Sequence, residues 1–494
     1  MRQSYQKRLI SHGAFSSKAW AEQVFSRTAG APVSTGNEVT LLKDAAENYP
    51  AWLASMKTAR KWIHFESYIV YDDATGREFG ELLAAKAQEG VKVRVAYDWL
   101  GGLGKTSRRF WQRLKEAGVE VRCFNPPRLD SPLGWISRDH RKMIGIDGEV
   151  AFVTGLCIGH MWTGNREKSI DPWRDTGIRV MGPAIADIET AFSQVWSATG
   201  EPLPVDELPD KGTIPPVGDV SLRVVSSTPS TGGVYRLDLQ IAALARNSLW
   251  LTDAYYAGTS SYVQALRAAA MDGVDVRLLV PGSTDIPIVR ALSRAGYKSL
   301  LEAGVRVFEW NGSMVHAKTA VADGYWARVG STNLNIASWI GNYELDVIVE
   351  NEDFARKMEG MYLTDLENST EIVLRTRHLK KTLAPDHPKS GHFGGRGRGS
   401  VGRVGAGAIR IGNVVGAAIT NHRVLGPAEL RIPFLGGLAL LIIAALFVLV
   451  PRWVAFPIAV ICGWLGFALL IKTVRLYRMR PAEINNDEKE GEKT

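Results

Sequence analysis

The sequence predicts an α/β protein that contains two copies of one unit, followed by a hydrophobic hairpin near the C-terminus. The pattern His-x-Lys-x-x-x-x-Asp occurs at His140–Asp147 and again at His316–Asp323, and each copy leads into small residues at the same offset. Strand-like and helix-like segments alternate before each copy, and two long apolar runs follow the second. Two matches in equivalent surroundings indicate a duplication rather than chance.

The segments around the pattern repeat as well. Gly90–Val95 (GVKVRV) corresponds to Gly273–Leu278 (GVDVRL), and Glu116–Val119 corresponds to Glu302–Val305, with the sequence EAGV in both. Each pair precedes its pattern by a similar distance. The repeat is far longer than the roughly 20–50 residues of solenoid repeats, so it predicts two domains packed face to face.

Hydrophobic periodicity predicts the elements of each unit. Runs rich in β-branched residues indicate strands, apolar residues at helical spacing indicate helices, and their alternation is typical of an α/β sheet with helices on its faces. Each pattern lies on a hairpin, which in unit one turns at Asp147-Gly148. Unit one is expected to contain strands at 38–42, 61–71, 91–99, 119–125, 142–146, 150–153 and 177–180, and helices at 49–56, 78–88 and 108–116. Unit two is expected to contain strands at 248–253, 274–280 and 305–310, and a helix at 263–271.

Cysteine usage and charge restrict the setting of the chain. Cys123, Cys157 and Cys462 have neither paired nor metal-ligand spacing, which favours a reducing cytosolic environment and predicts no metal site. The N-terminal residues contain no apolar core of signal-peptide length. The net charge of +8 is concentrated in 375–431, a segment that contains eleven Lys and Arg residues but only two acidic residues. Such a segment suits an anionic surface, either nucleic acid or lipid.

The apolar runs that follow favour lipid. Ile432–Val450 and Trp453–Ile471 are 19 residues each without a charge, long enough to span a ~30 Å hydrocarbon core as helices. Basic residues flank the pair outside the turn: Arg423, Arg431, Lys472, Arg475, Arg478 and Arg480. The turn carries only Arg452, so the positive-inside rule predicts a hairpin with both flanks, and hence both units, on the cytoplasmic side. The alternative, a buried hairpin in a soluble core, fits less well with a position outside both repeats.

These observations predict a division of the chain into seven segments. They are an N-terminal lead-in (1–36), unit one (37–201), a linker (202–219), unit two (220–374), a basic Gly/Arg-rich tether (375–431), the transmembrane hairpin (432–471) and a cytoplasmic tail (472–494).

The repeated residues are suited to phosphoryl transfer. A neutral histidine can attack phosphorus, and a second histidine can protonate the departing oxygen. Lys142 and Lys318 lie two residues beyond His140 and His316 on the same strand face, so they can neutralise the phosphate oxygens in place of a metal or other cofactor.

Further polar residues are expected to support this chemistry. Ser331 and Asn333 can donate hydrogen bonds to the phosphate, whereas Asp147 and Asp323 end their strands and are expected to stabilise the turns. Each histidine needs a carboxylate to orient its ring. The candidates are Glu344, which follows His316 by 28 residues, and Asp175, which follows His140 by 35. Glu66 fits either an active-site position or a half-buried strand.

The double pattern resembles the signature of the phospholipase D superfamily, and bacterial cardiolipin synthases in particular. The narrower resemblance, over residues 37–370, is carried by four segments: Ile63–Ile69 (IHFESYI), Val93–Asp98 (VRVAYD), Pro172–Thr176 (PWRDT) and Asn342–Leu345 (NYEL). It implies two phospholipase D-like units, each a mixed sheet flanked by helices, in a pseudo-two-fold arrangement around one active site. The implied reaction makes cardiolipin from phosphatidylglycerol through a phosphatidyl-histidine, with His140 favoured as nucleophile and His316 as acid and base.

The resemblance also implies partners and a location. Anionic phospholipids, namely phosphatidylglycerol and cardiolipin, and the inner membrane of a bacterial cell are expected, and nucleic acid is not. A hydrolytic phospholipase D and a nuclease or phosphodiesterase of the same superfamily remain alternatives, because the same residues serve all three reactions. Cys157 departs from the pattern by standing where unit two has Asn333.

Overall fold

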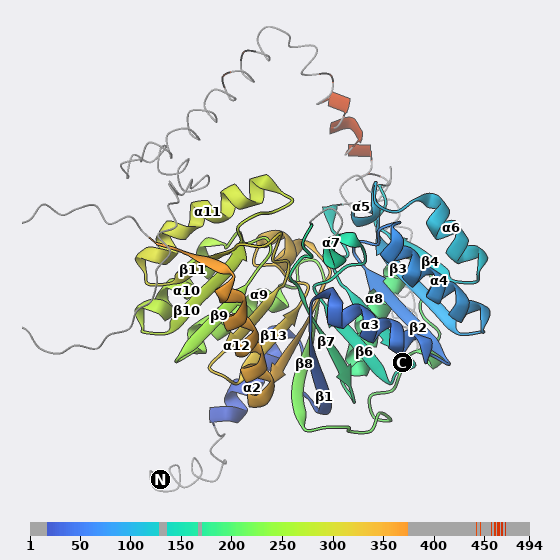
Figure 1. Cartoon of the computed structure of the whole chain (residues 1–494), viewed down its shortest axis with the longest axis horizontal. Helices are drawn as coiled ribbons and strands as arrows, with labels where there is room; N and C mark the ends of the chain where they lie inside the picture. The colour runs from blue at the N-terminus through green and yellow to red at the C-terminus, as the bar shows by residue number, and fades with distance from the viewer. Residues whose placement is uncertain are drawn as a thin grey trace, which may run out of the picture.

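One continuous mixed β-sheet runs through the body of the protein, with helices on both of its faces (Figure 1). The computed structural model describes residues 17–127, 136–165 and 170–373, together with scattered positions between 441 and 470. The predicted α/β class is confirmed. The two repeated units are not packed face to face as the repeat predicted, however, because they join edge to edge in a single sheet of 15 strands.

The first half of the sheet comes from residues before the linker, preceded by helix α2 (Ser17–Ala29). Its elements are β1 (Ser34–Lys43), α3 (Asp44–Lys57), β2 (Trp62–Ser67), α4 (Ala74–Gln88), β3 (Lys92–Asp98), α5 (Trp99–Gly102), α6 (Arg108–Glu116), β4 (Glu120–Phe124), β5 (Met143–Ile146), β6 (Val150–Thr154), α7 (His160–Thr163), β7 (Thr176–Met181) and α8 (Ile185–Ala198). A 3-10 turn, η2 (Val205–Glu207), lies in the expected linker.

The second half repeats this order. Its elements are β8 (Val220–Ser227), α9 (Gly233–Leu244), β9 (Ser248–Thr252), α10 (Ser260–Met271), β10 (Asp275–Pro281), α11 (Pro287–Glu302), β11 (Arg306–Trp310), β12 (Thr319–Ala322), β13 (Trp326–Gly330), the π-helical turn η3 (Ala337–Gly341), β14 (Glu344–Glu350), α12 (Glu352–Glu367) and β15 (Ser369–Ile372). Helices α8, α9, α11 and α12 were not assigned from the sequence.

The two halves meet at β1 and β8, which pair antiparallel in the centre of the sheet. Outward from this pair the strand order is β7-β6-β5-β2-β3-β4 on one side and β14-β13-β12-β9-β10-β11 on the other, with β15 added at the edge. In each half the three strands β2, β3 and β4, or β9, β10 and β11, are parallel, whereas the inner strands and the edge strand β15 pair antiparallel. The repeat in the sequence is therefore also a repeat in topology.

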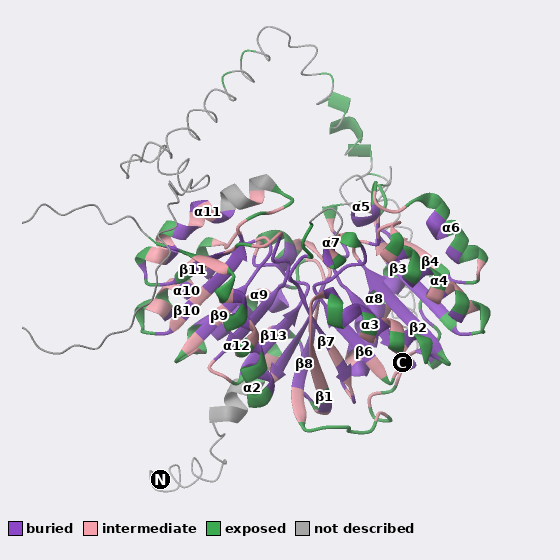
Figure 2. Ribbon diagram, viewed as in Figure 1, coloured by how far each residue is buried: buried purple, intermediate pink, exposed green. Residues whose placement is uncertain are grey.

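The hairpins that follow the two histidines lie deep in the sheet. Every residue of β5, β12 and β13 is buried, because helices cover both faces of these strands (Figure 2). Burial on both faces explains why these segments are continuous apolar runs rather than alternating ones. A rigid core therefore holds the residues that immediately precede β5 and β12.

The aspartates that end the two patterns stabilise these hairpins. Asp147 and Asp323 adopt left-handed backbone conformations, with φ of 56° and 51°, and each is followed by a glycine. The Asp147 carboxylate accepts from three consecutive backbone N–H groups, at 60–62 and 2.8 Å each. Asp323 binds the N–H groups at 246–248 in the same way. Both side chains join the hairpin turn to the start of the neighbouring strand.

Several expected segments differ from the structure or lie outside it. The strand expected at 61–71 ends at Ser67, where the serine hydroxyl donates to the carbonyl of Ile69, two residues later in the chain. The tether, the tail and nearly all of the hairpin expected at 432–471 lie outside the described residues. Among the helices of the described part, none has both the length and the apolar character needed to cross a bilayer.

Candidate active site

The two pattern histidines lie where the halves of the sheet meet. The backbone N–H of His140 donates to the Tyr343 carbonyl at 2.9 Å, and that of His316 donates to the Arg174 carbonyl at 2.6 Å. Isolated bridges pair Asp139 with Tyr343 and Arg174 with Val315. Each histidine-bearing segment is thus bound to the loop before β14 or β7 of the other half.

These loops bring each histidine a carboxylate from the opposite half. Nδ1 of His140 lies 2.9 Å and 3.1 Å from the two carboxylate oxygens of Glu344, and Nδ1 of His316 lies 2.7 Å from Oδ2 of Asp175. Sequence order places Glu344 after His316 and Asp175 after His140, whereas the structure pairs them the other way. The crossing follows from the antiparallel join of the halves, which directs each loop toward its counterpart's histidine.

Burial sets the charge of these groups. Burial lowers the pKa of His140. Burial and the positive charge of Lys318 together lower the pKa of His316 to about 3. Burial alone would raise the pKa of each carboxyl, but His316 and Lys318 together hold the pKa of Asp175 at about 2. His140 and its neighbours lower the pKa of Glu344 in the same way. Neutral imidazoles that donate Nδ1–H to carboxylates keep Nε2 available for attack on phosphorus.

Two buried lysines supply positive charge. The Lys142 ammonium donates to the His140 carbonyl, and the Lys318 ammonium donates to the His316 carbonyl and lies 3.0 Å from Nε2 of that ring. Both residues are 1% exposed. Burial and the charge of Lys142 lower the pKa of Lys318 to about 8. Two cations held together without solvent form a strong site for an anion such as a phosphodiester.

Two tyrosines that the sequence reading did not select line the same site. The Lys142 ammonium lies 5.5 Å from the Tyr68 ring centre, and the Lys318 ammonium lies 5.9 Å from that of Tyr255. The Tyr68 ring is also 5.0 Å from the His140 ring. Tyr68 belongs to Ile63–Ile69 (IHFESYI), one of the segments that carry the family resemblance, and that membership could have indicated a residue of the active site.

A second group of donors holds the carboxylates. The Ser331 hydroxyl donates to Glu344 at 2.6 Å, and the Asn342 amide donates to it at 3.2 Å. In the other half Nε1 of Trp162 donates to Asp175 at 2.9 Å. Ser331, expected to bind phosphate, is therefore engaged with a carboxylate. Trp162 lies on the short helix α7, and no feature of the sequence indicated its contact.

The small-residue segments differ between the halves. Asn333 is buried and its Oδ1 has no partner among the described residues, whereas the equivalent Cys157 is a buried thiol whose pKa is raised by burial. Gly155 is the residue of the first half that is equivalent to Ser331 in the second. A Cβ at Gly155 would lie 2.2 Å from an Asp175 oxygen. The carboxylate of Asp175 therefore occupies the space that a side chain would need.

Glu66 is buried on β2 near Lys142. Burial, together with the charge of Asp139 and a hydrogen bond with its side chain, raises the pKa of Glu66 well above the usual range. The structure thus places Glu66 beside the site with a carboxyl whose pKa is raised. In the other half Asp253 accepts from the Leu334 N–H at 2.7 Å, and burial raises its pKa to about 7.

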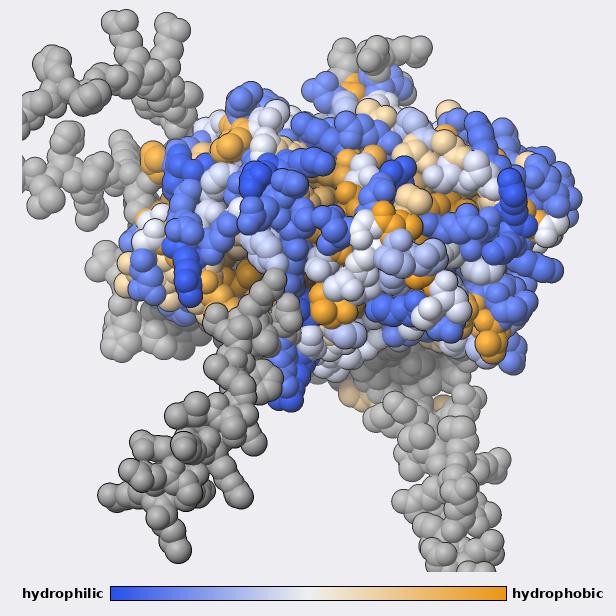
Figure 3. Space-filling view, turned by 90° about the horizontal axis from the view of Figure 1, so that it is seen from below, coloured by the Kyte–Doolittle hydropathy of each residue, from blue (hydrophilic) through white to orange (hydrophobic). Residues whose placement is uncertain are grey.

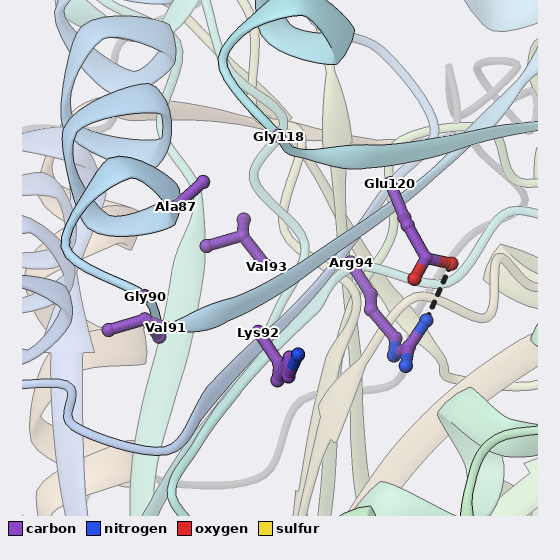
Figure 4. Close-up of a pocket in the computed structure, with 8 residues that line it drawn as sticks. All are labelled: Ala87, Gly90, Val91, Lys92, Val93, Arg94, Gly118 and Glu120. Atoms are coloured by element: carbon purple, nitrogen blue, oxygen red, sulfur yellow. Dashed lines mark ion pairs between the residues drawn. The ribbon is translucent and has the colours of Figure 1, made fainter.

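A pocket of about 180 Å³ lies away from these residues, at the start of β3 and the end of α4 (Figure 4). Its lining contains neither histidine nor either lysine of the site; an ion pair of 2.5 Å joins Arg94 to Glu120 on one side. No group of three or more His, Cys, Asp or Glu side chains suited to a metal occurs in the part of the chain that the structure describes.

Comparison with known proteins agrees with the geometry. Residues 53–196 and 239–365 match the family described as "Cardiolipin synthase, PLD-like domain", in which PLD stands for phospholipase D. The chain belongs to this family. It is 35% identical to the cardiolipin synthase of Alkalihalophilus pseudofirmus, over 69% of this chain and 68% of that protein. It is 32% identical to cardiolipin synthase A of Pseudomonas fluorescens, over 71% and 74%.

A solved structure shows the same fold. The crystal structure of phosphatidylserine synthase from Haemophilus influenzae aligns with a TM-score of 0.56 and 13% identity, over 71% of this chain and 91% of that chain. At 13% identity this likeness supports the fold of the present chain but does not indicate its substrates.

Proposed function

We propose that the protein is a membrane-bound phosphatidyltransferase that makes cardiolipin from phosphatidylglycerol through a phosphatidyl-histidine intermediate. The observation that carries this proposal is the pair of crossed histidine–carboxylate contacts beside two buried lysines. Membership of the cardiolipin synthase family supports the choice of substrate. We place the single active site between 37–201 and 220–374, related by a pseudo-two-fold axis through the β1–β8 pair.

In the first step Nε2 of His140 attacks the phosphorus of one phosphatidylglycerol. A P–N bond forms and the P–O bond to the glycerol headgroup breaks, while His316 gives its proton to the departing oxygen. Glu344 holds the His140 ring and stabilises the positive charge that develops on it. Lys142 and Lys318 stabilise the phosphate oxygens.

In the second step His316 removes the proton from a hydroxyl of another phosphatidylglycerol. That oxygen attacks the phosphorus, the P–N bond breaks, and cardiolipin leaves with His140 neutral again. In the empty site burial and Lys318 keep His316 unprotonated. A bound phosphodiester anion offsets the lysine charge, which allows His316 to carry the proton it must donate.

The segments beyond the catalytic units are assigned from sequence. We propose that 202–219 links the units, that 375–431 is a basic tether to anionic lipid, and that 432–471 is a hairpin in the inner membrane of a bacterial cell. The units then face the cytoplasm, where phosphatidylglycerol and cardiolipin of the inner leaflet are accessible.

The direct test is lipid analysis with purified full-length protein in mixed micelles of phosphatidylglycerol. We expect cardiolipin and glycerol, and their loss in His140→Ala. His160→Ala is a matched control, because His160 is half-exposed and pairs with Asp73 outside the site. Phosphatidic acid as the main product would instead identify a hydrolytic phospholipase D. Cleavage of nucleic acid without lipid turnover would identify a nuclease.

A further inference from the structure

Exposed aliphatic side chains occur in several of the segments that lead to the two pattern histidines. The five exposed isoleucines among the side chains that the structure describes, and one leucine considered with them, are each between 41% and 59% exposed. These six residues, here called the rim, are Leu103, Ile136, Ile170, Ile286, Ile336 and Ile340. They come from both halves, and Ile336 directly precedes the turn η3, which contains Ile340.

Rim residues of both halves are connected to His140. The Ser137 hydroxyl, next to Ile136, donates to the Gly341 carbonyl next to Ile340, at 2.7 Å. The adjoining residues continue this contact, since the N–H of Tyr343 donates to the Arg138 carbonyl at 2.8 Å. The same two segments then carry His140 and Glu344. Ile136 and Ile340 are therefore exposed residues of the two joined segments that carry His140 and Glu344.

The rim is connected to His316 on the other side. Ile170 belongs to the segment that leads to Trp173, whose ring centre lies 5.4 Å from that of His316. Ile286 follows Asp285, which accepts from the Tyr255 hydroxyl at 2.9 Å. The Tyr255 ring is 5.8 Å from the His316 ring.

Basic side chains lie beside the rim at Leu103. Lys105 lies between α5 and α6, with its ammonium 5.6 Å from the Tyr71 ring centre, and Arg108 and Arg109 begin α6. Helices α5, α7 and α11 mark this upper edge of the body (Figure 1). The opposite, lower face carries hydrophilic residues interspersed with apolar patches (Figure 3). Aliphatic and basic residues together are typical of a surface that enters the headgroup layer of an anionic membrane.

We propose that the rim docks the active site on an anionic phospholipid bilayer, with its isoleucines inserted among the headgroups. This inference rests on the proposed function, because the acyl chains of the substrate stay in the bilayer while its phosphodiester reaches the histidines. A ring of aliphatic side chains around the opening holds it against the lipid surface. The rim thus contributes to binding independently of the segment at 375–494.

A fluorescent label reports insertion directly in the full-length protein. Ile340→Cys and Ile136→Cys are labelled with a polarity-sensitive dye in a Cys123→Ser, Cys462→Ser background; Cys157 is buried and remains. With vesicles of phosphatidylglycerol and phosphatidylcholine that carry brominated acyl chains, we expect a blue shift and quenching at both positions. Met271→Cys, which is 71% exposed on α10, is the control and is expected to show neither.

Turnover gives a second measurement. Full insertion of one aliphatic side chain favours the bilayer-bound protein over the free protein by about tenfold. The double variant Ile136→Asn, Ile340→Asn should therefore lower the ratio of activity on vesicles to activity on micelles by at least about tenfold. Met271→Asn should leave this ratio unchanged.

The outcomes separate the two proposals. Absence of quenching at the rim, in a protein that makes cardiolipin in micelles, would refute docking and leave the proposed function standing. Quenching without any cardiolipin would do the reverse. A blue shift that depends on protein concentration without vesicles would identify the rim as an interface between two copies, and would also refute docking.

Discussion

Replacing Glu344 by glutamine tests the crossed contacts most directly. The amide is nearly the same size, but it removes the negative charge that lies 2.9 Å from Nδ1 of His140. At about 4 Å between charge centres and an effective dielectric constant of about 20, such a pair contributes about 4 kcal/mol to the stability of the imidazolium. That charge develops on His140 when it attacks phosphorus.

We therefore expect Glu344→Gln to lower kcat on dispersed phosphatidylglycerol by about 10²–10⁴, with a smaller change in KM. The pH profile should move as well. Glu344 raises the pKa of His140 against the larger effect of burial, so its loss lowers that pKa further. The acidic limb of the kcat/KM profile should shift to lower pH. Single-turnover release of glycerol measures the first step by itself.

A double-mutant cycle on the free energy of unfolding identifies which histidine is coupled. We expect a coupling of about 2 kcal/mol between Glu344→Gln and His140→Ala, because both remove one charge-assisted hydrogen bond, and almost none between Glu344→Gln and His316→Ala. Strong coupling to His316 instead, or a loss of kcat below tenfold, would show that the crossed arrangement is wrong.

Four further predictions follow from the site and the tail. Lys318 has a pKa of about 8 in the empty site, so it loses its charge as the pH rises, and KM for phosphatidylglycerol should increase above pH 8 in steady-state assays. Activity should survive exhaustive chelation, whereas Lys142→Met should cost on the order of 10²–10⁴ in rate; recovery only on adding a divalent ion would contradict both. Gly155→Ala should lower thermal stability and activity together, because its Cβ would meet the Asp175 carboxylate at 2.2 Å, and calorimetry that shows no change would argue against this contact. Truncation after Thr382 should leave a folded protein that turns over dispersed substrate but works poorly on bilayers; equal losses on both would place the tail within the active site.

The sequence by itself determined the fold class, the duplication and the identity of the charged residues. These follow from local patterns: alternating apolar residues predict strands, and His-x-Lys places two side chains on one strand face. The turn at Asp147 is local as well, because Asp-Gly between two apolar runs predicts a hairpin turn, but the contacts of its carboxylate with the N–H groups at 60–62 are long-range. Glu344 and Asp175 could be selected because each begins a strand at a comparable distance from a histidine.

Only the tertiary structure decided which carboxylate serves which histidine. His140 and Glu344 are 204 residues apart, and His316 and Asp175 are 141 apart, so their pairing depends on how β1 and β8 join the halves. The contact of Trp162 with Asp175 lies within the first half, and it depends on where α7 packs relative to the start of β7. Periodicity records which face of an element is buried, but it contains no information about which distant element covers that face.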